Sequence, residues 1–380
     1  MRKKVLIVCG TRPEAIKVLP VYKYLIEHYN SKLKTFLCST GQHKEMLQSV
    51  FDVFEVHSDI DLKLMKNNQG LSDLTSNILV SIDELLKEIK PDLILVQGDT
   101  TTAFASALAG FYNNIPIAHL EAGLRTYDLS APFPEEANRK LITSVANMHF
   151  APTQLNKESL INEGVQESSI CVTGNTVLDS LLYVDKKSKE DDVLGEKIKK
   201  DLELEGYKIS NRKFILITSH RRESFGQGFI NICAALKKLS RELPDYDLVF
   251  PVHLNPNVQN IIHSSLNNIS NVYLMKPVGY QSFVSLMSRS EFILTDSGGV
   301  QEEAPSLGKP VFVMREKTER KEGVLAKLVK IVGTTEEGIT RGVLNSVNNN
   351  FSDFSFVNNP YGDGNASQKV SEKIIGFLKR

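Results

Sequence analysis

Side chains that can transfer protons are concentrated in one short stretch of the sequence, HLEAGLRTYDLSAPFPEEANR at residues 119–139. Its first acid, Glu121, directly follows the apolar run IPIAHL. A carboxylate at the end of a buried run is costly unless a cation neutralises it, so we expect Arg125 or Arg139 to be its partner. A solvated loop would not need an acid at that point, and the stretch therefore indicates a functional site.

Further acids extend this candidate site. Glu135 and Glu136 follow Pro134 and would by default be the first-turn acids of a helix. Asp99, in VQGDTTTA, follows another buried run, and its ordinary interpretation is a helix N-cap. Where several carboxylates converge in one cleft, burial and mutual repulsion raise their pKa values. Such a cluster is suited to proton transfer.

The first apolar run ends in GTRPEAIK, where Thr11, Pro13 and Glu14 form the pattern of a capped helix start. That pattern leaves Arg12 and Lys17 unexplained. Two cations beside a helix N-terminus make an anion site. We give the plain helix start and the anion site equal weight.

A second turn of this kind, DSGGVQEEAPSLGKP, places Ser297, Gly298 and Gly299 at the start of a predicted helix. Two glycines let backbone N–H groups approach a phosphate, and the serine adds a hydroxyl donor. The acids beside it favour a nucleotide over free phosphate. Three further side chains suit one: Glu303 for the ribose hydroxyls, Arg320 to close over the site, and Phe283 to stack on a base. A common glycine-rich turn, and a core position for the aromatic ring, are the alternatives.

Two histidines follow predicted strands, His220 in TSHRRESFGQG and His253 in PVHLNPNV. A histidine flanked by two arginines is held neutral or donates to a departing diphosphate, although a satisfied histidine in a turn is the commoner case. No Ser-His-Asp order, GxSxG elbow, Walker loop or metal-ligand spacing occurs. We therefore expect no metal and no cofactor.

Short apolar runs that alternate with helical patterns must position these groups, as in KVLIVCG, DLILVQGD, KFILITSH and EFILTDSGG. This alternation is typical of βα units in parallel sheets that are covered on both faces. A charged segment without periodicity, at 182–212, separates two sets of them. We predict an α/β protein with two Rossmann-like, doubly wound domains, residues 1–175 and 176–363, and a final amphipathic helix within 364–380. Ligands of such sheets bind beyond the carboxyl ends of the strands, so we expect the active site in the interdomain cleft.

The composition excludes several classes of partner. The 380 residues carry 45 basic and 45 acidic side chains, so no overall field attracts nucleic acid or an acidic membrane surface. No run approaches the ~20 apolar residues of a membrane span, and the basic N-terminus lacks a signal-peptide core. The cysteines Cys9, Cys38, Cys171 and Cys233 are isolated, which is typical of buried or half-buried thiols in a reducing cytoplasm.

Eight motifs in order, over nearly the whole chain, resemble those of the non-hydrolysing UDP-N-acetylglucosamine 2-epimerases: GTRPEAIK, QGDTTT, HLEAGLRT, FPEEANR, TGNTVLDSL, HRRESFG, PVHLNPNV and DSGGVQEEAPSLGKPV. The resemblance implies a GT-B-like fold whose C-terminal helix crosses back to the first domain, and a homodimer. It implies reversible conversion of UDP-GlcNAc to UDP-ManNAc, by elimination of UDP to 2-acetamidoglucal and re-addition. Such a reaction supplies ManNAc-type precursors for cell-surface polysaccharide.

By motif position, the resemblance also implies a role for each candidate residue. The catalytic carboxylates would be Asp99, Glu121 and Glu135, with His220 near the diphosphate. UDP would contact Arg12, Lys17, Phe283, Ser297, Gly298, Gly299, Glu303 and Arg320. A second UDP-GlcNAc, acting as an activator beside the active site, would contact Gln42, His43, Glu136, Arg221 and His253.

Five positions depart from the family pattern. Glu45 and Asn68 stand where a glutamine and an arginine of the activator pocket are expected, which leaves activation open. Tyr127, Phe133 and Lys321 replace a glycine, a tryptophan and a proline, and leave open a modified UDP-N-acetylhexosamine as the substrate. A GT-B glycosyltransferase is the main alternative enzyme. A hydrolysing epimerase and a catalytically dead UDP-sugar sensor fit the motifs less well.

Overall fold

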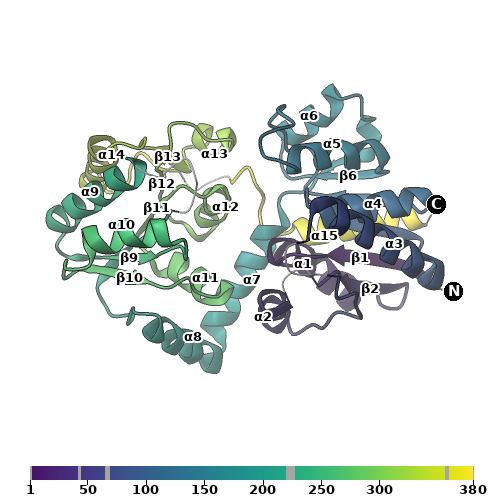
Figure 1. The fold of residues 1–380 in the computed structure, drawn as a ribbon, viewed down its shortest axis with the longest axis horizontal. Coiled ribbons are helices and arrows are strands. Elements are labelled where there is room, and N and C mark those ends of the chain that lie inside the picture. The colour runs from purple at the N-terminus through teal and green to yellow at the C-terminus, as the bar shows by residue number, and fades with distance from the viewer. Residues whose placement is uncertain (1, 42–43, 65–68, 220–226, 356–358, 380) are drawn as a thin grey trace. The chain divides into compact units, whose positions relative to one another are not determined.

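The computed structural model describes residues 2–41, 44–64, 69–219, 227–355 and 359–379 (Figure 1). It contains two compact units, each built on a parallel sheet. Unit 1 comprises Met1–Ser180 and Tyr361–Arg380, and unit 2 comprises Leu181–Pro360. The predicted α/β architecture with two parallel-sheet domains is confirmed.

The sheet of unit 1 has seven parallel strands in the order β3-β2-β1-β4-β5-β6-β7. The strands are β1 (Lys3–Cys9), β2 (Leu33–Ser39), β3 (Ile60–Asp61), β4 (Leu93–Gln97), β5 (Ile117–Leu120), β6 (Met148–Ala151) and β7 (Ile170–Val172). The helices are α1 (Arg12–Tyr29), α2 (Lys44–Phe54), α3 (Leu71–Ile89), α4 (Thr101–Tyr112), α5 (Glu135–Val145), α6 (Gln154–Asn162), α15 (Ala366–Leu378) and the short η1 (Glu167–Ser169). The apolar run of β1 is buried on both faces, since every side chain from Val5 to Cys9 is at most 1% exposed.

The direction of winding reverses between β1 and β4. The chain runs outward from β1 to β2 and β3, then returns to β4 and continues to β7. Loops that leave neighbouring strands toward opposite sides open a crevice at the carboxyl edge of a sheet. Gly10 follows β1 and Asp99 follows β4, so both stand at this switch point.

The C-terminal helix α15 belongs to unit 1 and packs against α1 (Figure 1). Asp179, in α7 (Thr176–Glu190), holds the start of α15. Its carboxylate accepts hydrogen bonds from the backbone N–H of Ser367 at 2.7 Å, from the Ser367 hydroxyl at 2.5 Å and from the N–H of Ala366 at 3.2 Å. Burial raises the pKa of Asp179, and these three donors oppose that shift.

The sheet of unit 2 has six parallel strands in the order β10-β9-β8-β11-β12-β13, with the same reversal between β8 and β11. The strands are β8 (Lys213–Thr218), β9 (Tyr246–Pro251), β10 (Val272–Met275), β11 (Phe292–Thr295), β12 (Val311–Val313) and β13 (Val329–Ile331). The helices are α8 (Asp192–Leu204), α9 (Gln227–Glu242), α10 (Pro256–Leu266), α11 (Tyr280–Arg289), α12 (Gly298–Glu303), α13 (Lys321–Leu325), α14 (Glu336–Asn348) and η3 (Ala304–Leu307). The charged segment at 182–212 is largely helical, forming the end of α7 and all of α8.

The four cysteines carry free thiols. Cys9, Cys38 and Cys233 are buried and Cys171 is half-buried, as predicted. Among the residues that the structure describes, no helix is both long and apolar enough to cross a membrane. The same residues contain no cluster of three or more metal-ligating side chains.

Two histidines are buried side by side in the sheet of unit 1. His119 in β5 pairs in register with His149 in β6, and the two are 1% and 2% exposed. The His119 Nε2–H donates to the carbonyl oxygen of Gly98 at 2.7 Å. Burial disfavours the charged imidazolium and lowers the pKa of each histidine to about 4. Both rings are therefore neutral at physiological pH.

This pair predicts acid sensitivity. In the unfolded chain these histidines take up protons as the pH falls below their ordinary pKa of about 6.5. In the folded chain they take up protons only near pH 4. The folded state therefore loses stability as the pH falls from about 6.5 to 4. His149→Phe should lose less stability between pH 7 and 5 than the wild type, by about 2 kcal/mol. Hydrogen exchange of the β5 amides measures this. The exposed His57, changed to Phe, is the control and should behave like the wild type; an equal loss in all three proteins would contradict the prediction.

Candidate active site

Acidic side chains collect at the carboxyl edge of the unit 1 sheet. Asp99 follows β4 after Gly98, and Glu121 follows β5. Glu121 adopts the left-handed backbone conformation, with φ of 65°, which costs about 1–2 kcal/mol for a residue other than glycine. A strained residue at a strand end is typical of a functional site.

The prediction that an arginine pairs with Glu121 was wrong. Neither Arg125 nor Arg139 neutralises it; the Nζ of Lys17 lies 2.5 Å from its Oε2. The Gln97 side chain donates to the same oxygen, and the Asn175 Nδ2 donates to Oε1 at 3.4 Å. Lys17 reaches the acid from the second turn of α1, which follows β1, two strands away from β5 in the sheet.

Asp99 is not a helix N-cap either. Thr100 caps α4 instead, and its hydroxyl accepts the N–H of Ala103 at 3.0 Å. The carboxylate of Asp99 points to α5, where the Nε of Arg139 donates to its Oδ2 at 2.8 Å. The Asp99 side chain stays 27% exposed, so it is paired and still open to solvent.

The first turn of α5 contains two acids in different surroundings. Glu135 has a buried Oε2 with no hydrogen-bond partner among the described residues. Glu136 is wholly buried, and its carboxylate accepts N–H groups of Thr126 and Tyr127 at 3.1 and 3.0 Å. Burial acts to raise the pKa of Glu136, but these donors and Arg139 outweigh it, and the pKa lies below its ordinary value.

The helix start at α1 is a complete capping box, as predicted. The Thr11 side chain accepts the N–H of Glu14, whose carboxylate accepts the N–H groups of Gly10 and Thr11 at 3.1 and 2.7 Å. The Thr100 hydroxyl donates to the same carboxylate at 2.7 Å. Burial raises the pKa of Glu14, which is 1% exposed. One acid thus ties the turn that carries Arg12 to the turn that carries Asp99.

The glycine-rich turn of unit 2 lies at the switch point of its own sheet. Ser297 is the N-cap of α12 and makes no side-chain cap. The guanidinium of Arg320 covers Gly298, since a Cβ there would lie 3.2 Å from its Cζ. The Nε of Arg320 donates to Glu302 at 2.7 Å. A Cβ on Gly299 would meet a carboxylate oxygen of Glu303 at 3.2 Å, so this acid lies against the turn.

The other predicted site residues belong neither to the acids of unit 1 nor to the glycine-rich turn of unit 2, or they lie outside the described residues. Phe283 is half-buried in α11. His253 is exposed beyond β9, and its Nδ1 accepts the N–H of Asn255 at 3.1 Å. Residues outside the described ranges are Gln42, His43, Asn68, His220 and Arg221, and the side chain of Glu45 is also outside them.

Sequence reasoning missed several side chains that position the acids. Gln97 and Asn175 bind Glu121. His119 binds the carbonyl oxygen of Gly98, the residue that precedes Asp99. The signal was present, since Gln97 stands in the motif QGDTTT and Asn175 in the motif TGNTVLDSL. Their polar type at the end of a buried strand was the available clue.

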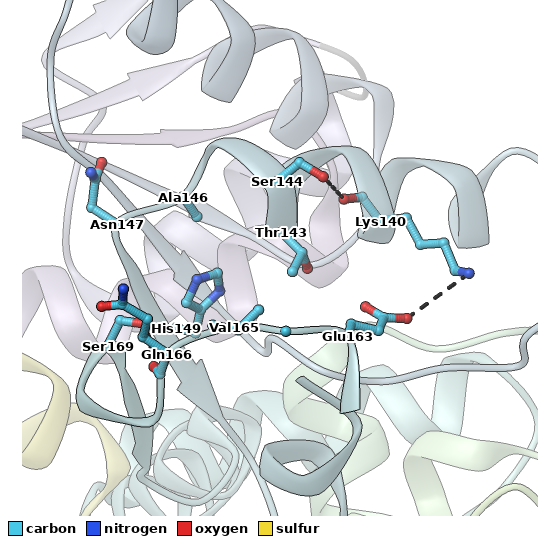
Figure 2. A pocket seen from close by; sticks show the side chains of 11 residues that line it. Lys140, Thr143, Ser144, Ala146, Asn147, His149, Glu163, Val165, Gln166 and Ser169 are labelled. Carbon is cyan, nitrogen blue, oxygen red and sulfur yellow. Dashed lines mark hydrogen bonds and ion pairs between the residues drawn. The ribbon is translucent and has the colours of Figure 1, made fainter. Parts of the chain in front are cut away.

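A hollow of about 520 Å³ lies at the opposite end of α5, lined among others by Lys140, Ser144 and His149 (Figure 2). Figure 2 shows the ion pair between Lys140 and Glu163, whose atoms are 3.9 Å apart. Glu163 also binds Arg125 at 2.7 Å. No predicted site residue lines this hollow, so it is separate from the acid cluster.

The paired parallel sheets, each with polar groups at its switch point, define a two-domain Rossmann-like protein of the GT-B type. The family model for UDP-N-acetylglucosamine 2-epimerase matches residues 27–375. A relative, the UDP-N-acetylglucosamine 2-epimerase of Campylobacter jejuni, is 50% identical over 378 residues, which cover 99% of this chain and 98% of that protein. The enzyme of the same name from Escherichia coli K12 is 46% identical over 374 residues, covering 98% of each chain. The chain therefore belongs to the UDP-N-acetylglucosamine 2-epimerase family.

Solved structures agree with this. The epimerase of Neisseria meningitidis bound to UDP-GlcNAc has a TM-score of 0.88 and 45% identity, covering 98% of this chain and 100% of that one. The wall teichoic acid polymerase TagF, at 14% identity and a TM-score of 0.60, shares the fold alone.

The turn after β1 predicts a large effect of a small substitution. A Cβ on Gly10 would overlap the hydroxyls of Thr40 and Thr102, so Gly10→Ala should destabilise unit 1 by about 1–3 kcal/mol and displace Arg12. Gly376→Ala is the control, because nothing lies within 4 Å of its added Cβ on α15. That variant should gain about 0.5–1 kcal/mol. Thermal melting measures both, and equal melting temperatures would contradict the close packing at Gly10.

Proposed function

We propose that the protein is a non-hydrolysing UDP-N-acetylglucosamine 2-epimerase that interconverts UDP-GlcNAc and UDP-ManNAc. Membership of the family, with relatives of this name over almost the whole chain, supports the assignment. The observation that carries it is the set of acids at one edge of the unit 1 sheet. Asp99 binds Arg139, Glu121 binds Lys17, and Glu135 has a buried oxygen without a hydrogen-bond partner among the described residues.

The reaction explains why carboxylates and cations are both needed. The hydrogen on C2 is not next to a carbonyl and resists direct removal. Breaking the C1–O bond, with the electron pair leaving on UDP, gives a cation-like centre that acidifies C2–H. Loss of that proton forms the C1=C2 bond of 2-acetamidoglucal. Protonation of C2 from the other face and re-addition of UDP at C1 gives the epimer.

The three acids have the different environments that two opposite proton transfers require. Asp99 and Glu121 are each held by a cation, Arg139 and Lys17 respectively. Glu135 has a buried oxygen that makes no hydrogen bond to any described residue, so this acid is placed to exchange a proton with a ligand. We propose that the three surround the sugar.

Two sets of residues are proposed to bind UDP, as the family resemblance implies. In unit 2 these are Phe283, Ser297, Gly298, Gly299, Glu303 and Arg320, and the packing of Arg320 on Gly298 supports a single small site there. In unit 1, Arg12 and Lys17 would meet the diphosphate, and the family resemblance assigns His220 to the same group. The leaving group thereby gains the positive charge that C1–O cleavage needs.

A modified UDP-N-acetylhexosamine is the second candidate substrate. Tyr127 and Phe133, in the loop that links Glu121 to Glu135, are 62% and 68% exposed. Tyr127 also holds a left-handed φ of 63°, which a glycine would adopt without strain. Two large exposed rings in this loop favour contact with an additional apolar substituent on the sugar.

We also infer a homodimer through unit 1. Val80, Phe111, Tyr112 and Leu141 are 57%, 54%, 63% and 48% exposed. They lie on α3, α4 and α5, which pack side by side, and exposed apolar groups of this size favour a protein partner. Light scattering on the purified protein tests this, and a monomer would overturn it.

The free thiols fit the cytoplasm, where UDP-sugars are made.

Proton NMR of the protein with UDP-GlcNAc in D2O tests the proposed function. We expect UDP-ManNAc to form and deuterium to enter C2 of both epimers, with no free ManNAc accumulating. Release of free ManNAc would indicate a hydrolysing enzyme. No exchange at C2, over a wide range of substrate concentration, would overturn the proposal in favour of the modified substrate.

The acid cluster predicts which substitutions stop turnover. Asp99→Asn, Glu121→Gln and Glu135→Gln should each lower kcat by about 100-fold or more, the scale of general acid-base groups. Asp128→Asn is the control, because Asp128 is exposed in the loop between Glu121 and Glu135 and its carboxylate binds only Ser130 among the described residues. Near-normal turnover in all three acid variants would contradict the assignment.

A further inference from the structure

We propose that Glu136 and Arg139 form one unit that positions the carboxylate of Asp99, and that Glu136 acts through this unit instead of touching an activator. The inference rests on the proposed function for the role of Asp99. It differs from the family-based expectation, which places Glu136 in the pocket of a second UDP-GlcNAc.

The guanidinium of Arg139 is fixed at every nitrogen. Its Nε and one terminal nitrogen both lie 2.8 Å from the Oδ2 of Asp99, and its other terminal nitrogen donates to the Oε2 of Glu136 at 2.8 Å. The Arg139 side chain is only 10% exposed. A planar fork gripped on both sides has one orientation, so the carboxylate that it holds has one position.

Helix α5 also holds the backbone of Asp99. The Nδ2 of Asn138 donates to the carbonyl oxygen of Asp99 at 2.8 Å. Neighbouring residues of one helix therefore grip the acid by its main chain and its side chain. This arrangement positions a reacting group, whereas a simple surface ion pair would leave it mobile.

Glu136 has no surface to offer a ligand. Its side chain is 0% exposed, and both oxygens are used. Tyr127 donates to Oε1, and Thr126 and Arg139 donate to Oε2. The acid thus ties the loop after β5 to the guanidinium that holds Asp99. A change in that loop would reach Asp99 through two short contacts.

The test compares two forks in unit 1. Arg139→Lys keeps the charge and loses the fork, and a displacement of about 1 Å at a catalytic group costs on the order of 100-fold. We expect its kcat to fall by about 30-fold or more, with KM within about threefold of the wild type. Arg125→Lys is the matched control. Arg125 is 1% exposed and grips Glu163 in the same way, without contact to the proposed catalytic acids.

Glu136→Gln separates positioning from activator binding. Gln keeps the size and one acceptor, and we expect kcat to fall by about 10-fold or more at all UDP-GlcNAc concentrations. The shape of the rate curve against UDP-GlcNAc should be unchanged. A normal maximal rate that is reached only at higher UDP-GlcNAc would instead show that Glu136 binds the activator, and would overturn the inference.

The remaining outcomes are equally decisive. Rates are expressed per chain that binds UDP, so partial unfolding does not imitate lost catalysis. A kcat for Arg139→Lys within threefold of the wild type, or equal losses in Arg139→Lys and Arg125→Lys, would overturn the proposal. Unfolding of both the Arg139 and the Glu136 variants would show that the unit serves the fold, and would also overturn it. An inactive wild type would reject the proposed function instead.

Discussion

A carboxylate in a partly buried site is costly to charge unless a cation or several N–H groups lie beside it, and the carboxyl edge of the unit 1 sheet contains several such acids. Four of them bind donors. Lys17 serves Glu121, Arg139 serves both Asp99 and Glu136, and Glu14 is held by N–H and O–H groups alone. The positions of α1 and α5 follow from this requirement, since these helices supply the cations.

The same requirement connects groups that are distant in sequence. Glu14 closes the capping box of α1 and accepts the hydroxyl of Thr100, the cap of α4. A hydrogen bond therefore joins the two turns at the switch point of the sheet. His119, kept neutral by burial, supports the carbonyl of Gly98 beside them. Arg12, Asp99 and Glu121 are thus presented by one hydrogen-bonded edge, and transfer of a proton to a defined carbon requires such positioning.

Local patterns in the sequence predicted the fold well and the ion pairs poorly. Apolar runs set off by helical segments indicated parallel sheets, because burial on both faces leaves a direct signature in each run. The capping box at Thr11 and Glu14 was likewise readable within four residues. The partner of Glu121 could not be predicted from the sequence, because Lys17 meets this acid only after β1, β4 and β5 have assembled side by side. The N-cap interpretation weighed for Asp99 was wrong, because the hydroxyl of the next residue, Thr100, caps α4.

The central chemical claim is that the acids of unit 1 act on C2 only while the C1–O bond is broken. UDP-GlcNAc labelled with ¹⁸O between C1 and the β-phosphorus tests this most directly, with ³¹P NMR to follow the label in recovered substrate. Cleavage and return of UDP should move the label from the bridge to the non-bridging oxygens of the β-phosphate. A label that stays in the bridge while C2 exchanges its proton with solvent would contradict elimination and the roles given to these acids.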